Sequence, residues 1–128
     1  MSVELMQAYY KTYNSEDSAA LRKFYHEDVV LASAQGEQNG ADAIIGTYQY
    51  LIDLFHDQMT PTSIDIISDD GTGKITAQVK ITDCFTAKKP VDDFMGQSLA
   101  IGESFELKLQ GTYEIEGGRF KRIAIAMQ

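Results

Sequence analysis

The repeat of apolar residues along positions 1–25 predicts two helices. Leu5, Tyr9 and Tyr13 recur at a spacing of four residues, which places them on one face of a first helix. A shorter apolar face over 21–25 follows Asn14 and Ser15, whose side chains can cap a helix. The chain is therefore expected to open with a two-helix hairpin.

A third helix is expected from Ala41, after a short buried strand over 29–32 and a polar segment over 36–40. Its apolar residues recur at spacings of four, three and four, which is typical of one helical face. We interpret His56 as the end of this helix and Pro61 as the change from helix to strand. The apolar face consists of Ile44, Tyr48, Leu51 and Phe55.

Alternation of apolar and polar residues predicts antiparallel strands throughout the second half of the chain. A hairpin is expected over 64–81, with its turn in the glycine-containing segment 69–73. A long strand over 99–115 and a last strand over 119–127 follow. Gly111 interrupts the long strand and predicts a bend or bulge there.

Helices followed by antiparallel strands predict an α+β fold in which the helices pack on one face of the sheet. The helical faces are rich in tyrosine and phenylalanine, and such faces rarely fill a curved sheet completely, so a pocket between them is expected. The longest connection, 86–97, carries apolar residues among its charges. We expect it to cover or bind something.

Length and composition narrow the class of protein. With 128 residues, 44% hydrophobic and 23% charged, the chain is expected to form one domain over 1–128. Its net charge of -8 argues against nucleic acid and membranes as partners, because both present negative charge. The first helix lacks the pattern of a signal peptide, so a cytoplasmic protein is expected. Cys84 is the single cysteine and no Cys/His cluster occurs, so no metal site or other cofactor is predicted.

Three stretches, 13–30, 39–45 and 116–123, resemble the nuclear-transport-factor-2-like superfamily, and the order of elements is similar over nearly the whole chain. That superfamily includes ketosteroid isomerases, SnoaL-like polyketide cyclases, scytalone dehydratases, epoxide hydrolases and non-catalytic binding proteins. The resemblance implies a cone-shaped, curved antiparallel sheet with three N-terminal helices on its concave face. It also implies a small-molecule pocket and a homodimer that forms through the sheet.

Ketosteroid isomerases use an aspartate base, with a tyrosine and a protonated aspartic acid as oxyanion donors. The resemblance places the tyrosine at Tyr9, the base near Leu31 and the acid at Gly111. Two of these three positions lack the required carboxyl group, which argues against steroid-type isomerisation. The superfamily hosts unrelated chemistries on one fold, so the function has to be argued from the site.

Asp83 is the candidate catalytic residue, because it continues the apolar, odd-numbered face of the strand over 75–81. A carboxyl group on that face is removed from water, which raises its pKa and suits a general acid or base. Tyr9 is the candidate proton donor beside it. The alternative is that Asp83 reaches solvent at the end of its strand or caps the following loop.

The candidate ligand-binding residues are those whose side chains are expected to face the pocket. Core packing is the alternative interpretation for those that are expected on helices. They are Tyr9, Tyr13, Tyr48, Leu51, Phe55, Phe85 and Leu107.

The leading hypothesis is a small-molecule-binding domain for a hydrophobic or aromatic ligand, with lyase, isomerase or cyclase chemistry by proton transfer as its catalytic form. The alternative is a non-catalytic dimerisation or protein-interaction domain. The two differ in the cavity that they require. A binder or enzyme needs about 300 Å³ or more with a convergent polar group, whereas an interaction domain fills its cone with side chains.

Overall fold

The computed structural model describes residues 2–128, in which three helices and eight strands follow one another. In chain order they are α1 (Ser2–Asn14), α2 (Ser18–Arg22), β1 (Tyr25–Ser33), β2 (Gly36–Asn39), α3 (Ala41–Leu54), β3 (Phe55–Asp69), β4 (Lys74–Ala87), β5 (Val91–Phe94), β6 (Gln97–Leu99), β7 (Ser104–Glu116) and β8 (Arg119–Met127).

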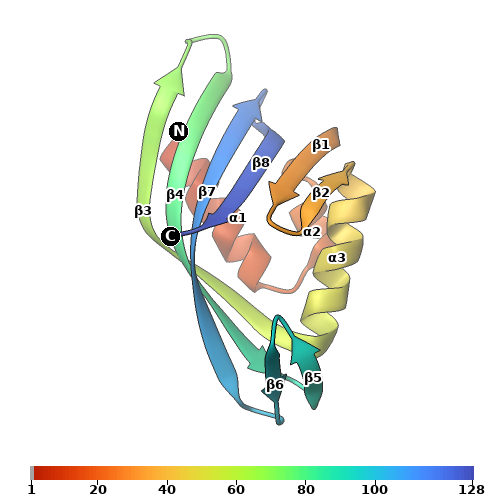
Figure 1. Cartoon of the computed structure of the whole chain (residues 1–128). Coiled ribbons are helices and arrows are strands. Elements are labelled where there is room, and N and C mark those ends of the chain that lie inside the picture. The colour runs from red at the N-terminus through yellow and green to blue at the C-terminus, as the bar shows by residue number, and fades with distance from the viewer. Residues whose placement is uncertain (1) are drawn as a thin grey trace.

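Six strands form one sheet in the order β2-β1-β8-β7-β4-β3, and β5 pairs only with β6. Neighbouring strands are antiparallel except β1 and β8, which are parallel. Figure 1 shows the long strands β3, β4 and β7 bending along their length, with α3 beside β1 and β2. The predicted α+β cone with three helices and a curved antiparallel sheet is therefore confirmed, apart from the parallel pair β1/β8, which was not predicted.

The helices cover one face of the sheet, and the main core lies between them. In β4 the odd-numbered Ala77, Val79 and Ile81 are fully buried, whereas Lys74 and Lys80 are exposed on the other face. This alternation follows from the period of two along a strand. The buried face packs in a single cluster with residues of α1 and α3, such as Met6, Tyr9, Ile44 and Tyr48.

The prediction of a second helix reaching Tyr25 was wrong, because α2 ends at Arg22 and Tyr25 begins β1. The Phe24 carbonyl accepts a hydrogen bond from the Phe120 amide at 2.7 Å, and Tyr25 lies beside Phe120 across the parallel pair β1/β8. The last strand thus holds the chain in an extended conformation. Phe120 comes 95 residues after Tyr25 (120 minus 25). The residues around Tyr25 therefore give no local sign of this pairing.

The predicted end of the third helix was also wrong, since Phe55 and His56 lie on β3 and not on α3. Phe55 adopts extended backbone angles as the C-terminal cap of α3. Pro61 lies inside β3, which is the edge strand of the sheet, with a register shift between Pro61 and Ser63. An edge strand tolerates proline because one of its sides has no ladder of hydrogen bonds to lose.

Three further expectations need correction. The polar segment 36–40 forms β2, a short strand paired with β1. Leu99 belongs to β6, and Ile101 is 66% exposed in a turn, so neither lies on the long strand β7. Gly111 makes no bulge, because its pairing with Val79 and with Ile125 is in continuous register.

The long connection 86–97 covers a second apolar cluster, as its apolar residues suggested. Phe94 of β5 lies with its ring centroid 4.8 Å from that of Phe55 and 5.9 Å from that of Phe85. Val91 is buried in the same cluster. The β5–β6 hairpin therefore closes the far end of the bent sheet (Figure 1).

Within residues 2–128, none of the helices combines the length and the apolar character that crossing a bilayer requires.

Candidate functional site

Two buried carboxyl groups lie next to each other on the inner face of the sheet. Asp57 of β3 is 0% exposed and Asp83 of β4 is 2% exposed. Asp57 pairs with Phe85 and Asp83 with Met59, so the two aspartates are diagonal neighbours on adjacent strands. Their carboxyl groups hydrogen-bond to each other. Asp83 was predicted to point inward from its strand. In the structure it does so, and it lies next to a second acid.

The pair holds a proton between its two members. Burial, the hydrogen bond to Asp57 and the nearby charge of Asp57 together raise the pKa of Asp83 to about 10, and burial contributes most. Burial also raises the pKa of Asp57, while hydrogen bonds from Asp83 and Tyr13 act in the opposite direction. At neutral pH Asp83 therefore keeps its proton, which lies in the hydrogen bond between the two acids.

The neighbour of the dyad that donates a hydrogen bond to it is a hydroxyl group and not a cation. Tyr13 donates a hydrogen bond to Asp57 Oδ2 at 2.7 Å. Among residues 2–128, no lysine, arginine or histidine forms an ion pair with either aspartate. Asp57 Oδ1 and Asp83 Oδ1 are buried and accept no hydrogen bond from any donor outside the pair among the described residues. Carboxyl groups buried with so few donors are uncommon, and a functional role is one explanation.

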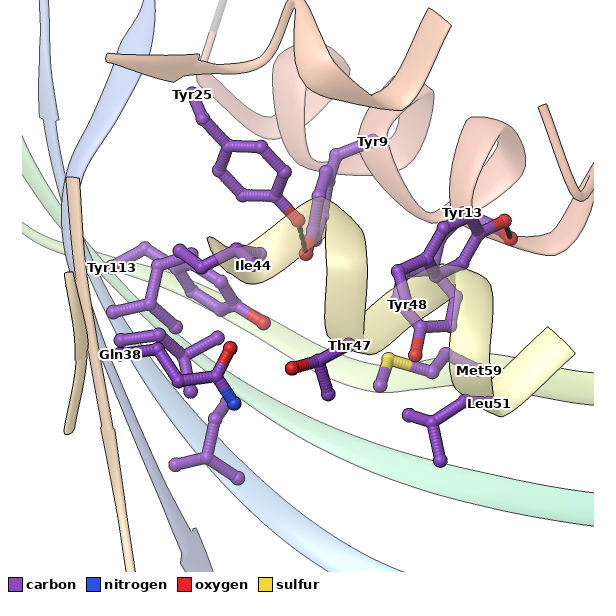
Figure 2. A pocket seen from close by; sticks show the side chains of 13 residues that line it. Tyr9, Tyr13, Tyr25, Gln38, Ile44, Thr47, Tyr48, Leu51, Met59 and Tyr113 are labelled. Atoms are coloured by element: carbon purple, nitrogen blue, oxygen red, sulfur yellow. Dashed lines mark hydrogen bonds between the residues drawn. The ribbon is translucent and has the colours of Figure 1, made fainter. Parts of the chain in front are cut away.

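One cavity, which we call the tyrosine cavity, lies between the sheet and helices α1 and α3, with a volume of about 150 Å³ (Figure 2). Its wall is mostly aromatic and aliphatic, with few polar atoms. The lining residues are Tyr9, Tyr13, Tyr25, Leu31, Gln38, Ile44, Thr47, Tyr48, Leu51, Met59, Tyr113, Ile123 and Ile125.

The hydroxyl groups around the tyrosine cavity are hydrogen-bonded in pairs. Tyr9 and Tyr25 share a hydrogen bond of 2.8 Å, drawn as a dashed line in Figure 2. Tyr10 donates to the hydroxyl oxygen of Tyr113 at 2.9 Å, and Tyr48 donates to the carbonyl of Tyr13 at 2.5 Å. Burial raises the pKa of Tyr9 and of Tyr113 well above the ordinary value, so both stay neutral.

A second cavity, which we call the Asp83 cavity, has a volume of about 200 Å³ and lies beside the dyad. Asp83, Phe85, Leu107 and Leu109 form part of its wall. Ile125 lines both this cavity and the tyrosine cavity. Each cavity alone is smaller than the roughly 300 Å³ expected of a typical ligand pocket.

The structure divides the predicted site residues between these cavities. Tyr9, Tyr13, Tyr48 and Leu51 line the tyrosine cavity. The Asp83 cavity takes in Asp83, Phe85 and Leu107. Phe55 lines neither, because it is 0% exposed in the cluster under the β5–β6 hairpin. Tyr9 donates to or accepts from Tyr25, and the hydroxyl next to the dyad is that of Tyr13.

Sequence reasoning missed Asp57, Gln38 and Tyr113. Asp57 was missed because the third helix was predicted to end at His56. With β3 beginning at Phe55, positions 55, 57 and 59 face the same side of the sheet. The alternation of Phe55, Asp57 and Met59 is the signal that could have found it. Gln38 carried no such signal, since its role depends on β2 pairing with β1.

Within residues 2–128, no group of three or more His, Cys, Asp or Glu side chains is placed to hold a metal ion. The polar groups that the described residues place at the site are the carboxyl, hydroxyl and amide groups named above.

The family model of the SnoaL-like domain matches residues 6–123. The chain belongs to this family. The match runs from α1 into β8 and thus includes both aspartates of the dyad and every residue of the tyrosine cavity except Ile125. A comparison with curated protein sequences found no significant match.

Solved structures share the fold at low sequence identity. A candidate polyketide cyclase from Xanthomonas campestris pv. campestris is 23% identical, with a TM-score of 0.73, covering 98% of this chain and 89% of its own. A candidate aromatic ring hydroxylase from Novosphingobium aromaticivorans is 14% identical, with a TM-score of 0.79, over 97% and 84% of the two chains. A protein with a ketosteroid isomerase-like fold from Catenulispora acidiphila, in complex with trimethylamine, is 13% identical with a TM-score of 0.71, over 95% and 83%. These likenesses show the fold, and the activity has to come from the site.

Proposed function

We propose that this SnoaL-like domain binds a small, largely apolar molecule inside the cone and exchanges a proton with it through the Asp57–Asp83 dyad. The observation that carries the proposal is the buried pair of acids itself, in which Asp83 lines a cavity. An acid pair without a cation is costly to bury. Such a cost is typical of a functional site.

In the proposed reaction the dyad acts as a general base. The carboxyl group of Asp83 takes a proton from the ligand, and the proton that Asp83 shares with Asp57 moves onto Asp57. The dyad then carries two protons and no charge, and the electron pair of the broken bond stays on the ligand. Burial raises the pKa of both acids, so the dyad binds the second proton more tightly than an exposed carboxylate would.

The step after deprotonation determines the class of reaction. Return of the proton at another atom of the ligand is isomerisation, loss of a leaving group is a lyase reaction, and attack of the new carbanion on a second carbonyl of the same molecule is cyclisation. All three begin with the same proton transfer. The largely apolar wall of the Asp83 cavity, which includes Phe85 and Leu107, fits a hydrophobic or aromatic ligand for each of them.

A ligand screen followed by deuterium exchange tests this proposal. Steroids, polyketides, terpenoids and small acids are screened by thermal shift, and compounds that bind are incubated with the protein in D₂O. We expect deuterium to enter a bound ketone next to its carbonyl, and Asp83→Asn to slow this at least about 100-fold. Asp92→Asn, an exposed aspartate on β5, is the matched control. Equal exchange by the wild type and Asp83→Asn would exclude the dyad as the base.

The alternative function is a non-catalytic interaction domain, and the family resemblance also leads us to propose a homodimer through the outer face of the sheet. That face carries short side chains, including Thr76, Thr82 and Thr112, which alternate with the buried residues of β4 and β7. Thr112→Arg is expected to convert a dimer into a monomer in light scattering. A screen without any binding compound, together with a stable dimer, would favour this alternative.

A further inference from the structure

Two polar groups of the tyrosine cavity can each make one more hydrogen bond, and they are complementary. Tyr113 accepts its hydrogen bond from Tyr10 at 2.9 Å, so its own proton is free to be donated. Among residues 2–128, no hydrogen bond is donated by this hydroxyl group. Gln38 Oε1 is buried and has no hydrogen-bond partner there either. The cavity thus offers one donor, Tyr113, and one acceptor, Gln38.

Both groups belong to the wall of the same cavity. Gln38 comes from β2 and Tyr113 from β7, on opposite sides of β1 and β8 in the sheet. Figure 2 shows the amide of Gln38 and the hydroxyl of Tyr113 pointing toward the middle of the lining side chains. Thr47 of α3 lines the same cavity and is exposed, so it stands where the cavity meets the surface.

The absence of a side chain at Gly111 fixes the direction of the Tyr113 hydroxyl. A Cβ atom at position 111 would lie 2.7 Å from Tyr113 Cε1 and 3.0 Å from its hydroxyl oxygen. The ring therefore leans back along β7 over Gly111, which pairs with Ile125 of the cavity wall. Ionisation of Tyr113 is suppressed by burial, so the group acts as a donor.

We infer that the tyrosine cavity recognises a single aromatic or alicyclic ring that carries a hydroxyl group. A hydroxyl oxygen accepts the proton of Tyr113, and the same hydroxyl donates its proton to Gln38 Oε1. This one group satisfies both unpaired atoms, which a pure donor or a pure acceptor does not. A cavity of about 150 Å³ is large enough for one six-membered ring. The inference rests on the proposed binding function and names its ligand class.

Phenol, anisole and toluene test the inference, because they share a ring and differ in hydrogen bonding. Phenol can donate and accept, anisole can only accept, and toluene can do neither. We expect the wild type to bind phenol about tenfold more tightly than anisole in titration calorimetry. Gln38→Leu is expected to abolish that difference. Gln49→Leu, the same substitution on the exposed side of α3, is expected to leave it unchanged.

Tyr113→Phe provides a second variant, in which anisole should lose its advantage over toluene. Equal binding of all three compounds by the wild type would overturn the hydroxyl inference while leaving small-molecule binding intact. An unchanged preference for phenol in both Gln38→Leu and Tyr113→Phe would overturn it as well. Failure of the separate deuterium-exchange experiment would remove the proposed chemistry and leave the ligand class of this cavity untouched.

Discussion

Asp57 and Asp83 hydrogen-bond to each other from neighbouring strands, and both side chains are almost completely buried. Because no positive charge of residues 2–128 pairs with either group, the dyad keeps a proton that an exposed aspartate would lose near pH 4. The folded state therefore binds more protons than the unfolded chain at neutral pH. This difference links the stability of the fold to pH.

Asp83→Asn is expected to stabilise the protein at pH 8 and to flatten the dependence of stability on pH. The pKa of Asp83 is raised to about 10 in the folded state, so its favourable contribution is complete below about pH 4 and is lost as the pH rises toward 10. An asparagine keeps a donor for Asp57 and does not titrate. We expect a gain of about 1–2 kcal/mol in the free energy of unfolding at pH 8.

Urea unfolding of the wild type and Asp83→Asn at several pH values between 4 and 9 measures this effect. The exposed Asp92→Asn is the control and should change stability by less than about 0.5 kcal/mol at each pH. Parallel stability curves for the wild type and Asp83→Asn would show that the dyad does not hold the proton.

Tyr13→Phe is expected to destabilise the protein by about 1.5–3 kcal/mol at pH 8, because it leaves the buried charge of Asp57 without its hydroxyl donor. The loss should shrink at acid pH, where Asp57 is protonated. Tyr50→Phe, at a residue that is 60% exposed, is the matched control. A loss that does not depend on pH would mean that the Tyr13 hydroxyl contributes to stability through packing and not through its hydrogen bond to Asp57.

Gly111→Ala is expected to destabilise the protein by about 1–3 kcal/mol, since the new methyl group would lie 2.7 Å from the Tyr113 ring. The cost should largely disappear in a Tyr113→Ala background, which a double-mutant cycle by thermal unfolding measures. Gly46→Ala on α3 is the opposite case, because nothing lies within 4 Å of its new Cβ. We expect that change to stabilise by up to about 1 kcal/mol. Equal effects at both glycines would contradict the role assigned to Tyr113.

Ile125→Ala is expected to join the tyrosine cavity to the Asp83 cavity, because Ile125 lines both. The variant should lose about 1–2 kcal/mol of stability and accept ligands with two fused rings that the wild type excludes. Thermal shifts with phenol and 2-naphthol measure the change in size preference. Ile67→Ala, the same substitution at a 57% exposed residue of β3, is the control. A preference that stays the same would mean that the two cavities are separated by more than this side chain.

Much of the fold follows from local patterns in the sequence. The helical face of Leu5, Tyr9 and Tyr13 and the alternation along β4 predict α1 and the inward direction of Asp83. These patterns are reliable because each depends only on the period of one element and on the burial of its apolar side. The resemblance to the SnoaL-like proteins adds the arrangement of these elements as a cone, which the structure confirms.

The site itself was decided by contacts between distant segments. Asp57 meets Asp83 only because β3 starts at Phe55, and Tyr25 leaves its expected helix because β8 pairs with β1. Gly111 looked like a bend, yet it makes room for the Tyr113 ring. Local propensity differs between such alternatives by about 1 kcal/mol or less per residue, which packing and strand pairing easily exceed. The sequence alone thus determined the α+β cone and the inward carboxyl group of Asp83. The tertiary structure decided which acid and which hydroxyl that carboxyl group meets.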